Sequence, residues 1–500
     1  MVLKLIRNRA PSRQTHDGER VPLLTALLSL SWLQLAQLFS GWLAQTCDSI
    51  DMYNVSLPVN VVRLKTEFHQ DAGIVMMMVI SLNYLFRIFG GVLFGIWSDR
   101  FGRKWPLVAI LLFCSLLQLA TAYTQTIEEF LILRSLSGFA MGGVWGIAVS
   151  NGLENLPVET RGLASGILGQ GYAVGYLIST ILSTYLVTDN RHTWRILFWT
   201  GSGMIALAAI VRAAIPESRA FLCANARREA QRRRTGQEPK AIIHEAGLVL
   251  KTNWKSCLLY VGIITQVNTA LHGSQDLYPD YLFKTKGFTT RQATIAAMVG
   301  SCGAIVGGVT AGSLSQIMGR RLTMILFLLF GAAFIPPWML PSTFARHCIG
   351  VFWVQFGVQG VTGVVPIWLA ELSPPGFCAL FPGVIVQIGN ILGSGSVEIE
   401  TILAGAKSLE KTTIVNGGTT VVPVYGTAMC IIFGLVTFFA IQVLLIASEN
   451  HGSYFEVQNT AFEEGNFNGH ALPQTCLEEE KKSPRLAVNH LDVDIGDRLW

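Results

Sequence analysis

The sequence predicts an all-α integral membrane protein with twelve transmembrane helices arranged as two six-helix halves. Its 500 residues are 51% hydrophobic and 14% charged, and the mean hydropathy is +0.45. Soluble domains are much less apolar. The apolar residues form stretches of about 20, the length at which an α-helix crosses roughly 30 Å of hydrocarbon. A lipid bilayer is therefore the predicted solvent.

The distribution of charge divides the chain into five segments. We expect a polar N-terminal tail at 1–32 with a possible interfacial helix, a first half at 33–215, a central loop at 216–255, a second half at 256–446, and a polar, acidic, disordered tail at 447–500. The predicted spans are 33–61, 73–97, 105–123, 128–150, 162–187, 194–215, 256–283, 291–313, 322–342, 347–370, 380–402 and 424–446.

The basic residues indicate the orientation. Most of the Lys and Arg residues outside the spans lie in the two tails, in the central loop and in the loops on the same side, which predicts that both termini are cytoplasmic. The nine cysteines are scattered singly without a C-x-x-C pair, so we expect neither a disulfide framework nor a metal site. We expect no cofactor.

The two halves repeat. A shift of 217 residues places GIWSDRFGRK (95–104) on GSLSQIMGRR (312–321), and the same shift places Glu154 on Glu371. One shift that matches separate loops and spans indicates duplication. Six spans plus six in a parallel repeat is the architecture of major facilitator transporters, whose substrate site lies between the halves near the middle of the bilayer.

The segment GIWSDRFGRK also resembles the family-wide loop motif of major facilitators, G-x-x-x-D-[RK]-x-G-R-[RK]. The matching residues are Gly95, Asp99, Arg100, Gly102, Arg103 and Lys104. Gly95 permits a close approach of helices, and Asp99 can accept hydrogen bonds from the N-terminus of a neighbouring helix. The alternative interpretation is a plain basic turn that anchors the loop on the inner side.

The seventh predicted span contains the densest set of polar residues, in NTALHGSQDLYP (268–279). Asn268, His272 and Asp276 recur every four residues and form a stripe along one side of a helix. Ionisable groups are costly in lipid and usually face a cavity, which makes this stripe a candidate functional site.

This stripe resembles the signature N-x-x-[ST]-H-x-[ST]-Q-D-x-x-x-T of the fungal lactate and carboxylate permeases, which are related to the sialate:proton symporters. Asn268, His272, Ser274, Gln275 and Asp276 match it. The chain departs from the family pattern with Leu271 and Asp280 in this span, and with Val144 in the fourth span, where the family carries an acidic residue.

Further residues resemble the same family. Asp48 and Asp51 match a D-x-x-D pair in the first span, Arg87 matches an arginine in the second span, and Gln387 and Asn390 match a Q-x-x-N pair implicated in substrate binding. The resemblance covers nearly all of the chain from its first predicted span to its last.

The resemblance and the chemistry of the residues together assign roles. Arg87 presents a planar fork suited to a carboxylate, and His272 can change its charge near neutral pH. We expect substrate contacts from Arg87, Asn268, His272, Ser274, Gln275, Gln387 and Asn390. We expect proton coupling through His272, Asp276, Asp48 and Asp51. The alternatives are a mouth-lining role for Asp48 and Asp51 and a purely structural role for Arg134.

The predicted function is proton-coupled symport of a short carboxylate of the lactate or pyruvate type by a monomer in a plasma membrane. The alternatives are a dicarboxylate, a sialate or another organic solute on the same fold, and a nutrient sensor that does not transport. An enzyme is not expected, because the spans offer no metal cluster and no nucleophile with its base. The sequence contains no phosphate-binding loop of a primary pump.

Overall fold

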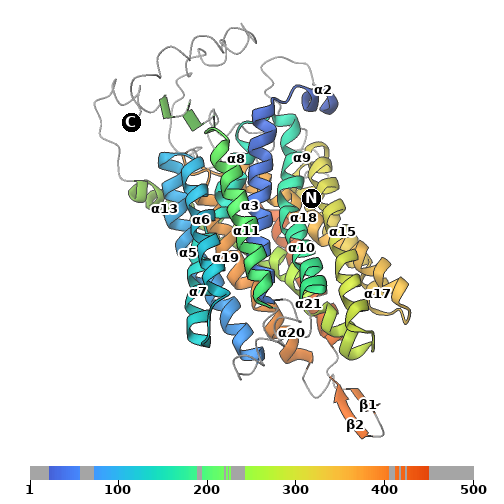
Figure 1. Cartoon of the computed structure of the whole chain (residues 1–500). Coiled ribbons are helices and arrows are strands. Elements are labelled where there is room, and N and C mark those ends of the chain that lie inside the picture. Colours follow the sequence, from blue (N-terminus) through green and yellow to red (C-terminus); the bar gives the residue numbers. More distant parts are fainter. Residues whose placement is uncertain are drawn as a thin grey trace.

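The computed structural model describes most of the chain. The described residues are 22–56, 72–187, 194–218, 221–222, 225–226, 242–374, 376–404, 411–415, 418–422 and 425–449. They form one elongated bundle of helices, with a small strand hairpin at one end (Figure 1).

The elements follow the predicted spans closely. The first group consists of α2 (Leu23–Leu28), α3 (Trp32–Ser56), α5 (Ala72–Phe101), α6 (Lys104–Thr121), α7 (Ile127–Met141), α8 (Val144–Leu153), α9 (Val158–Gly169), α10 (Gly171–Leu186) and α11 (Arg195–Ala214). The second group consists of α13 (Ile242–Gln275), α14 (Tyr278–Asp280), the π-helix η1 (Tyr281–Thr285), α15 (Thr290–Met318), α16 (Arg320–Ala333), α17 (Ile335–Met339), α18 (Phe344–Leu372), α19 (Leu380–Ser394), α20 (Ser396–Ala404), β1 (Lys411–Val415), β2 (Gly418–Val422) and α21 (Tyr425–Ile446).

The prediction of an all-α membrane protein is confirmed. Among the described residues, eight helices are long and apolar enough to cross a membrane. The other predicted spans, 33–61, 162–187, 256–283 and 322–342, coincide with α3, α9 and α10, α13, and α16 and α17. These helices are either interrupted or rich in polar residues, which lowers their apolar signal. The number of twelve crossings stays a prediction.

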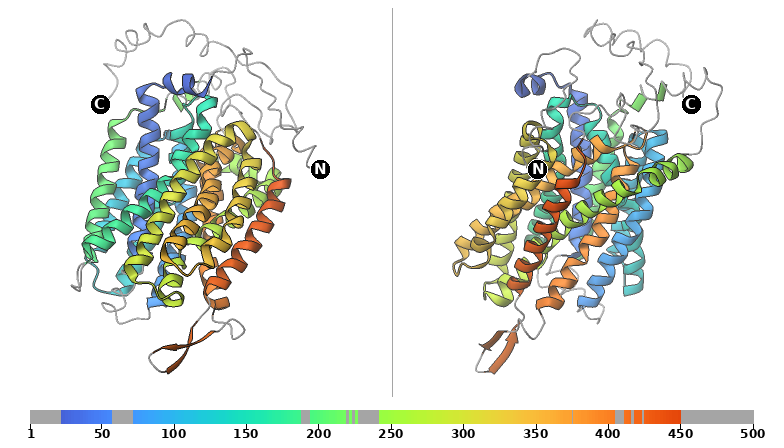
Figure 2. Two further views of the ribbon diagram at one scale, coloured as in Figure 1. Left: turned by 90° about the vertical axis from the view of Figure 1, so that its right-hand side faces the viewer. Right: turned by 180° about the vertical axis from the view of Figure 1, so that it is seen from behind.

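The helices of the two groups gather on two sides of the bundle. Figure 2 shows the blue-to-green helices on one side and the yellow-to-red helices on the other. Across the boundary, α5 packs against α19, and α9 packs against α15 and α18. The exact domain limits stay a prediction, but this arrangement brings residues from both groups to a common interior.

The structure departs from the sequence expectation at two places. α13 begins at Ile242, inside the segment expected to be a loop, and its backbone leaves the helical conformation at Asn253 (φ −122°, ψ 22°). The strands β1 and β2 form an antiparallel hairpin, with Lys411 opposite Val422. Its β-branched residues and the Asn-Gly sequence between the strands are typical of a hairpin. We call this end of the bundle the hairpin end.

Glycines set the distance between several pairs of helices. A Cβ atom added to Gly307 in α15 would lie 2.2 Å from the backbone oxygen of Phe356 in α18, and one added to Gly142 would lie 2.1 Å from the backbone oxygen of Arg87. Backbone atoms cannot move aside as a flexible side chain can, so only glycine permits these contacts. The second of them places the α7–α8 junction directly beside Arg87.

We predict that Gly307→Ala lowers the stability of the bundle by about 1–3 kcal/mol, because the added methyl group overpacks a backbone contact. The matched control is Gly434→Ala in α21, where an added Cβ atom has no neighbour within 4 Å. The measurement is the thermal unfolding midpoint of both purified variants in detergent. Equal midpoints for the two variants would contradict the assigned role of Gly307.

Candidate functional site

A cavity lined by both apolar and polar side chains lies between the two groups of helices, and six of the predicted site residues line it. They are Asp48, Arg87, Asn268, His272, Gln387 and Asn390. The centre of a water molecule can reach about 90 Å³ of it, which is room for several water molecules or for a small organic solute. Residues of α3 and α5 face residues of α13 and α19 across this space, so the site belongs to both groups.

Arg87 is the main cation of the cavity, and it is paired. Its Nη2 atom lies 2.7 Å from Oδ1 of Asp48, and its Nη1 atom donates a hydrogen bond of 3.0 Å to Oδ2. Its Nε atom donates to Oδ1 of Asn83 at 2.9 Å, one turn back on α5. Both charged residues are less than 5% exposed. Because a buried charge needs a partner, each of these two groups balances the charge of the other.

The opposite wall of the cavity consists of linked amides. Asn268 donates a hydrogen bond from Nδ2 to Oδ1 of Asn390 at 2.7 Å, and Asn390 donates from Nδ2 to Oε1 of Gln387 at 3.1 Å. Gln387 in turn donates from Nε2 to the backbone oxygen of Gly142 at 3.0 Å. This chain fixes the orientation of three amides and connects α13 and α19 to the first group of helices.

His272 lies between an acid and a phenol. Its Nδ1 atom is 2.9 Å from Oδ2 of Asp276, and its Nε2 atom is 3.5 Å from the hydroxyl oxygen of Tyr84. The Tyr84 ring also lies 5.6 Å from the guanidinium carbon of Arg87. Tyr84 therefore stands between the arginine of one wall and the histidine of the other.

Two predicted substrate residues lie outside this cavity. Ser274 donates to the backbone oxygen of Leu271 at 3.0 Å and accepts a hydrogen bond from Gln355 at 3.1 Å. Gln275 contacts the hydroxyl of Tyr53 at 3.4 Å. Both line a second, smaller pocket instead. A helix turns by about 100° per residue, so Ser274 lies roughly 200° around α13 from His272.

Asp51 also lies away from the cavity lining. Its carboxylate accepts hydrogen bonds from Arg134 at 2.7 and 3.0 Å and from the hydroxyl of Ser137 at 2.7 Å. Asp51 and Arg134 are at most 1% exposed. Such contacts are typical of a structural ion pair, the alternative considered for Arg134. A role of Asp51 in proton coupling stays a prediction.

The three departures from the permease signature have different surroundings. Leu271 lines the cavity, where it replaces a hydroxyl with an apolar wall. Val144 is fully buried in a hydrophobic cluster with residues such as Phe94, so an acid there would be buried among apolar side chains. Asp280 forms a partly exposed ion pair of 2.6 Å with Lys284. Leu271 is thus the departure that directly alters the cavity wall.

Several cavity residues escaped the sequence analysis. Tyr84, Tyr172, Gln359 and Thr362 line the cavity, and Asn83 orients Arg87. Asn83 precedes Arg87 by four residues, the same spacing that marked the stripe in the seventh span, so that pattern could have identified it. Tyr84 also precedes Arg87 by three residues on α5, and Gln359 and Thr362 are three residues apart on α18, so helical spacing could have indicated them too. Tyr172 is the one cavity residue among these that comes from α10.

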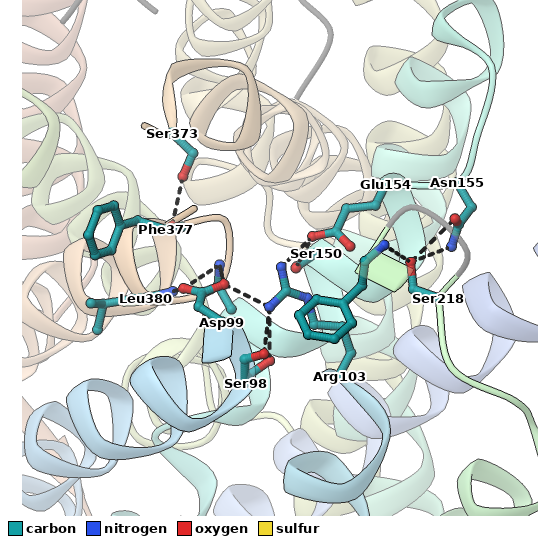
Figure 3. A network of polar contacts seen from close by, with 12 residues as sticks. Ser98, Asp99, Arg103, Ser150, Glu154, Asn155, Ser218, Ser373, Phe377 and Leu380 are labelled. Carbon is teal, nitrogen blue, oxygen red and sulfur yellow. Dashed lines mark hydrogen bonds and ion pairs between the residues drawn. The ribbon is translucent and has the colours of Figure 1, made fainter. Parts of the chain in front are cut away.

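The loop motif forms a network at the end of the bundle opposite the hairpin, which we call the motif end (Figure 3). Asp99 accepts hydrogen bonds from the backbone N–H groups of Ala379 at 3.0 Å and Leu380 at 2.9 Å, at the start of α19. The predicted interaction with a helix N-terminus is therefore confirmed. Arg103 joins Asp99 to Glu154, with contacts of 2.7 Å to each.

The same network explains two further residues of the motif. Burial by itself lowers the pKa of Arg103, but the nearby Glu154 and Asp99 carboxylates raise that pKa above its ordinary value, so the guanidinium stays charged. A Cβ atom added to Gly95 would lie 2.8 Å from the Cα atom of Leu380, which confirms the expected close approach of α5 and α19. Arg100, in contrast, is exposed.

The second copy of the motif makes a related contact, from the second group of helices to the first. Arg320 contacts Glu371 at 2.8 Å, as Arg103 contacts Glu154. Gln316 stands where the first copy has Asp99, and it donates a hydrogen bond of 2.8 Å to the backbone oxygen of Val158 at the start of α9. Each group of helices therefore contacts the other at the motif end.

Comparisons with known proteins agree with this architecture. A family model described as Major Facilitator Superfamily matches residues 41–395. A Saccharomyces cerevisiae protein named carboxylic acid transporter protein homolog is 30% identical over 442 residues, which are 86% of this chain and 71% of that protein. The Escherichia coli sialic acid transporter NanX is 21% identical, over 85% of this chain and 96% of its own.

A solved structure also matches the fold. The proton:xylose symporter XylE bound to 6-bromo-6-deoxy-D-glucose superposes with a TM-score of 0.64 at 16% identity, and the match covers 86% of this chain and 98% of that chain. At this identity the likeness concerns the fold of the chain.

We predict that Asp51→Asn and Arg134→Gln each lower stability by about 3–5 kcal/mol, because each leaves a buried group without its ionic partner. The double variant Asp51→Leu with Arg134→Met removes both groups and should recover most of that loss. The measurement is the thermal unfolding midpoint, with Lys284→Gln as the control for an exposed pair worth at most about 1 kcal/mol. Single variants as stable as this control would show that the buried pair contributes little.

Proposed function

Because the chain belongs to the major facilitator superfamily, we propose that this multi-pass membrane transporter carries a short monocarboxylate together with a proton by alternating access in a plasma membrane. The observation that carries the proposal is the cavity itself, in which a buried arginine faces three linked amides and a histidine. The printed names of the yeast and Escherichia coli relatives, which refer to organic acids, support the same class of substrate.

The charge of the cavity favours a single carboxylate. Arg87 is the only Lys or Arg among the described residues that line it. A guanidinium binds a carboxylate through two parallel hydrogen bonds, and the amides of Asn268, Asn390 and Gln387 can contact the remaining oxygen atoms of a hydroxy or keto acid. A dicarboxylate would bring a second negative charge that has no permanent cation opposite it. The single cation therefore favours a lactate-type or pyruvate-type substrate over a dicarboxylate.

The pairing of Arg87 with Asp48 suggests how a proton takes part. A substrate carboxylate and the Asp48 carboxylate compete for one guanidinium, because both are anions that need the same two N–H groups. A proton on Asp48 removes its charge and releases Arg87 for the substrate. Substrate and proton then enter the cavity together, so the net charge of the buried site is unchanged.

The contacts between the two groups support an alternating-access cycle. Asp99 holds the start of α19, and Gln316 holds the start of α9, both at the motif end. These hydrogen bonds and the close glycine contacts between α5 and α19 must be released before the cavity can open toward that end. Opening and closing then alternate around a fixed binding site.

We predict that purified protein in liposomes accumulates labelled lactate or pyruvate when an inward proton gradient is imposed. If one proton enters with each carboxylate in an electroneutral symport, a gradient of one pH unit supports about a tenfold accumulation of the carboxylate. A protonophore should abolish it. Uptake should fall when unlabelled monocarboxylate is added, but much less with a dicarboxylate or a sialate. Uptake that does not depend on the proton gradient would exclude proton symport. Complete lack of uptake would favour a sensor that does not transport.

We predict that Arg87→Lys raises the apparent KM for the carboxylate by about 10-fold to 100-fold, because lysine keeps the charge but loses the fork. The control is Arg346→Lys, which changes an exposed arginine of α18.

Asp48→Asn should keep carboxylate binding but lose the dependence of that binding on pH. The double variant Arg87→Gln with Asp48→Asn should insert normally and fail to bind. Restored uptake in the double variant would instead make Arg87 a structural partner of Asp48.

A further inference from the structure

One acidic residue of the predicted membrane spans, Glu400, has no hydrogen-bond partner among the described residues. Glu400 lies in α20, within a stretch apolar enough to span a membrane, and it is 0% exposed. Neither of its carboxylate oxygens has a hydrogen-bond partner in the described part of the chain. Glu400 is inconspicuous in the sequence, because it stands two residues after Glu398 near the end of a predicted span, where acidic residues are ordinary border residues.

Among the described residues, no Lys or Arg is paired with Glu400. α20 packs against α13 and α21. On α13, a Cβ atom added to Gly273 would lie 2.4 Å from Oε1 of Glu400, and Asp276 is near enough for its charge to repel a charge on Glu400. The titratable residues of α21 are Tyr425 and Cys430.

Lys284, a described cation beside Tyr425 of α21, is already engaged. Lys284 of η1 forms an ion pair of 2.6 Å with Asp280, and its ammonium lies 5.5 Å from the centre of the Tyr425 ring. His272, the other titratable group of this side of α13, is bound to Asp276 through Nδ1. A carboxylate on Glu400 would therefore be an isolated buried anion with a like charge beside it.

An isolated buried carboxylate costs several kcal/mol or more, and a protein avoids that cost by binding a proton or a cation. A hydrated cation needs space and several oxygen ligands, but both oxygens of Glu400 are sealed from solvent. The described residues contain no cluster of three or more His, Cys, Asp or Glu able to hold a metal ion. A proton is the ligand that fits.

We propose that Glu400 is a proton-binding residue that links protonation to the closure of α20 against α13. With its proton bound, the neutral acid packs against Gly273 as observed. When the Oε–H bond breaks, water that enters between α20 and α13 accepts the proton and can carry it to Asp276, which contacts the imidazole of His272, so charge is conserved at each step. The anion left on Glu400 then favours separation of α20 from α13 and entry of water.

This proposal rests on the proposed symport for its role in coupling, and the contact between Asp276 and His272 supplies the last step of the path. Asp276 directly follows α13, and its side chain is 28% exposed, so water can reach it. Gly273 and Asp276 are three residues apart and share one side of the helix. Glu400, Asp276 and His272 thus lead from the hairpin end of the bundle to the wall of the cavity.

The first test measures protonation directly, without substrate. Infrared difference spectra of wild-type protein and Glu400→Gln in liposomes at neutral pH should show a carbonyl band of a protonated carboxylic acid that only the wild type has. The control is Asp280→Asn, which changes an exposed carboxylate and should leave that band unchanged. The proposal would be overturned if the two spectra did not differ in this carbonyl band. It would also be overturned if Glu400→Gln instead removed a band of an ionised carboxylate. A shift of the band on adding sodium ions would assign the site to a cation instead.

The second test measures coupling. Glu400→Gln resembles the protonated acid, so it should exchange labelled for unlabelled carboxylate at equal pH within about twofold of wild type. Under a gradient of one pH unit it should lose the roughly tenfold accumulation that one coupled proton supports. Glu400→Asp restores a titratable group and should recover part of it. Full accumulation by Glu400→Gln would overturn the coupling role.

The two tests separate this proposal from the proposed function. If wild-type protein transports no monocarboxylate but shows the Glu400 band, then the symport of that substrate fails and the proton site stands. If wild-type protein accumulates the substrate and Glu400→Gln does so equally, the symport stands and the role of Glu400 fails. Should Glu400→Gln not fold, Glu400→Asp gives the same infrared test, since its shorter side chain should shift the frequency of the band.

Discussion

The ion pair between Arg87 and Asp48 is the interaction on which the central cavity depends. In a low-dielectric interior, either charge alone would cost several kcal/mol, so neither residue can lose its partner without a replacement. The other partners available to Arg87 in this space are a substrate anion and water. A transport cycle that begins with this pair must therefore exchange one anion for another, and it can do so at small cost only when a proton neutralises Asp48.

This constraint operates inside a bundle whose helices are held at short distances by glycine. The contact between Gly142 and the backbone of Arg87 fixes α5 against the junction of α7 and α8. Gln387 binds the backbone oxygen of the same glycine from the other group of helices. The anion site and the boundary between the groups therefore share one short segment of backbone, so binding at Arg87 and movement along the boundary affect the same atoms.

Much of this arrangement follows from the sequence because it depends on local patterns. The length of the apolar stretches gave the fold class, and the GIWSDRFGRK segment indicated the contact between Asp99 and a helix N-terminus. Helical spacing placed Asn268 and His272 on the cavity side. The same geometry argues against Ser274, which family resemblance had added to the site, since it faces the opposite side of α13.

What the sequence could not supply are contacts between residues far apart in the chain. Asp48 and Asp51 are three residues apart and look equivalent, but one faces Arg87 in the cavity and the other is sealed against Arg134. Only the packing of α3 between its neighbours separates these roles. Glu400 was likewise inconspicuous, because the lack of a partner is a property of its surroundings and not of its own segment.

The two carboxylates that we propose to bind a proton belong to different groups of helices, and this limits how coupling can work. In the proposed cycle, Asp48 in α3 must be neutral for a substrate to bind Arg87, and Glu400 in α20 must be neutral for α13 and α20 to pack. If one proton serves both residues through Asp276 and His272, the loaded carrier moves no net charge with a monocarboxylate. If each residue takes its own proton, one positive charge crosses in each cycle, and a membrane potential of 100 mV contributes about 2.3 kcal/mol to accumulation. Whether the two acids share one proton or bind one each thus determines whether the proposed carrier responds to voltage.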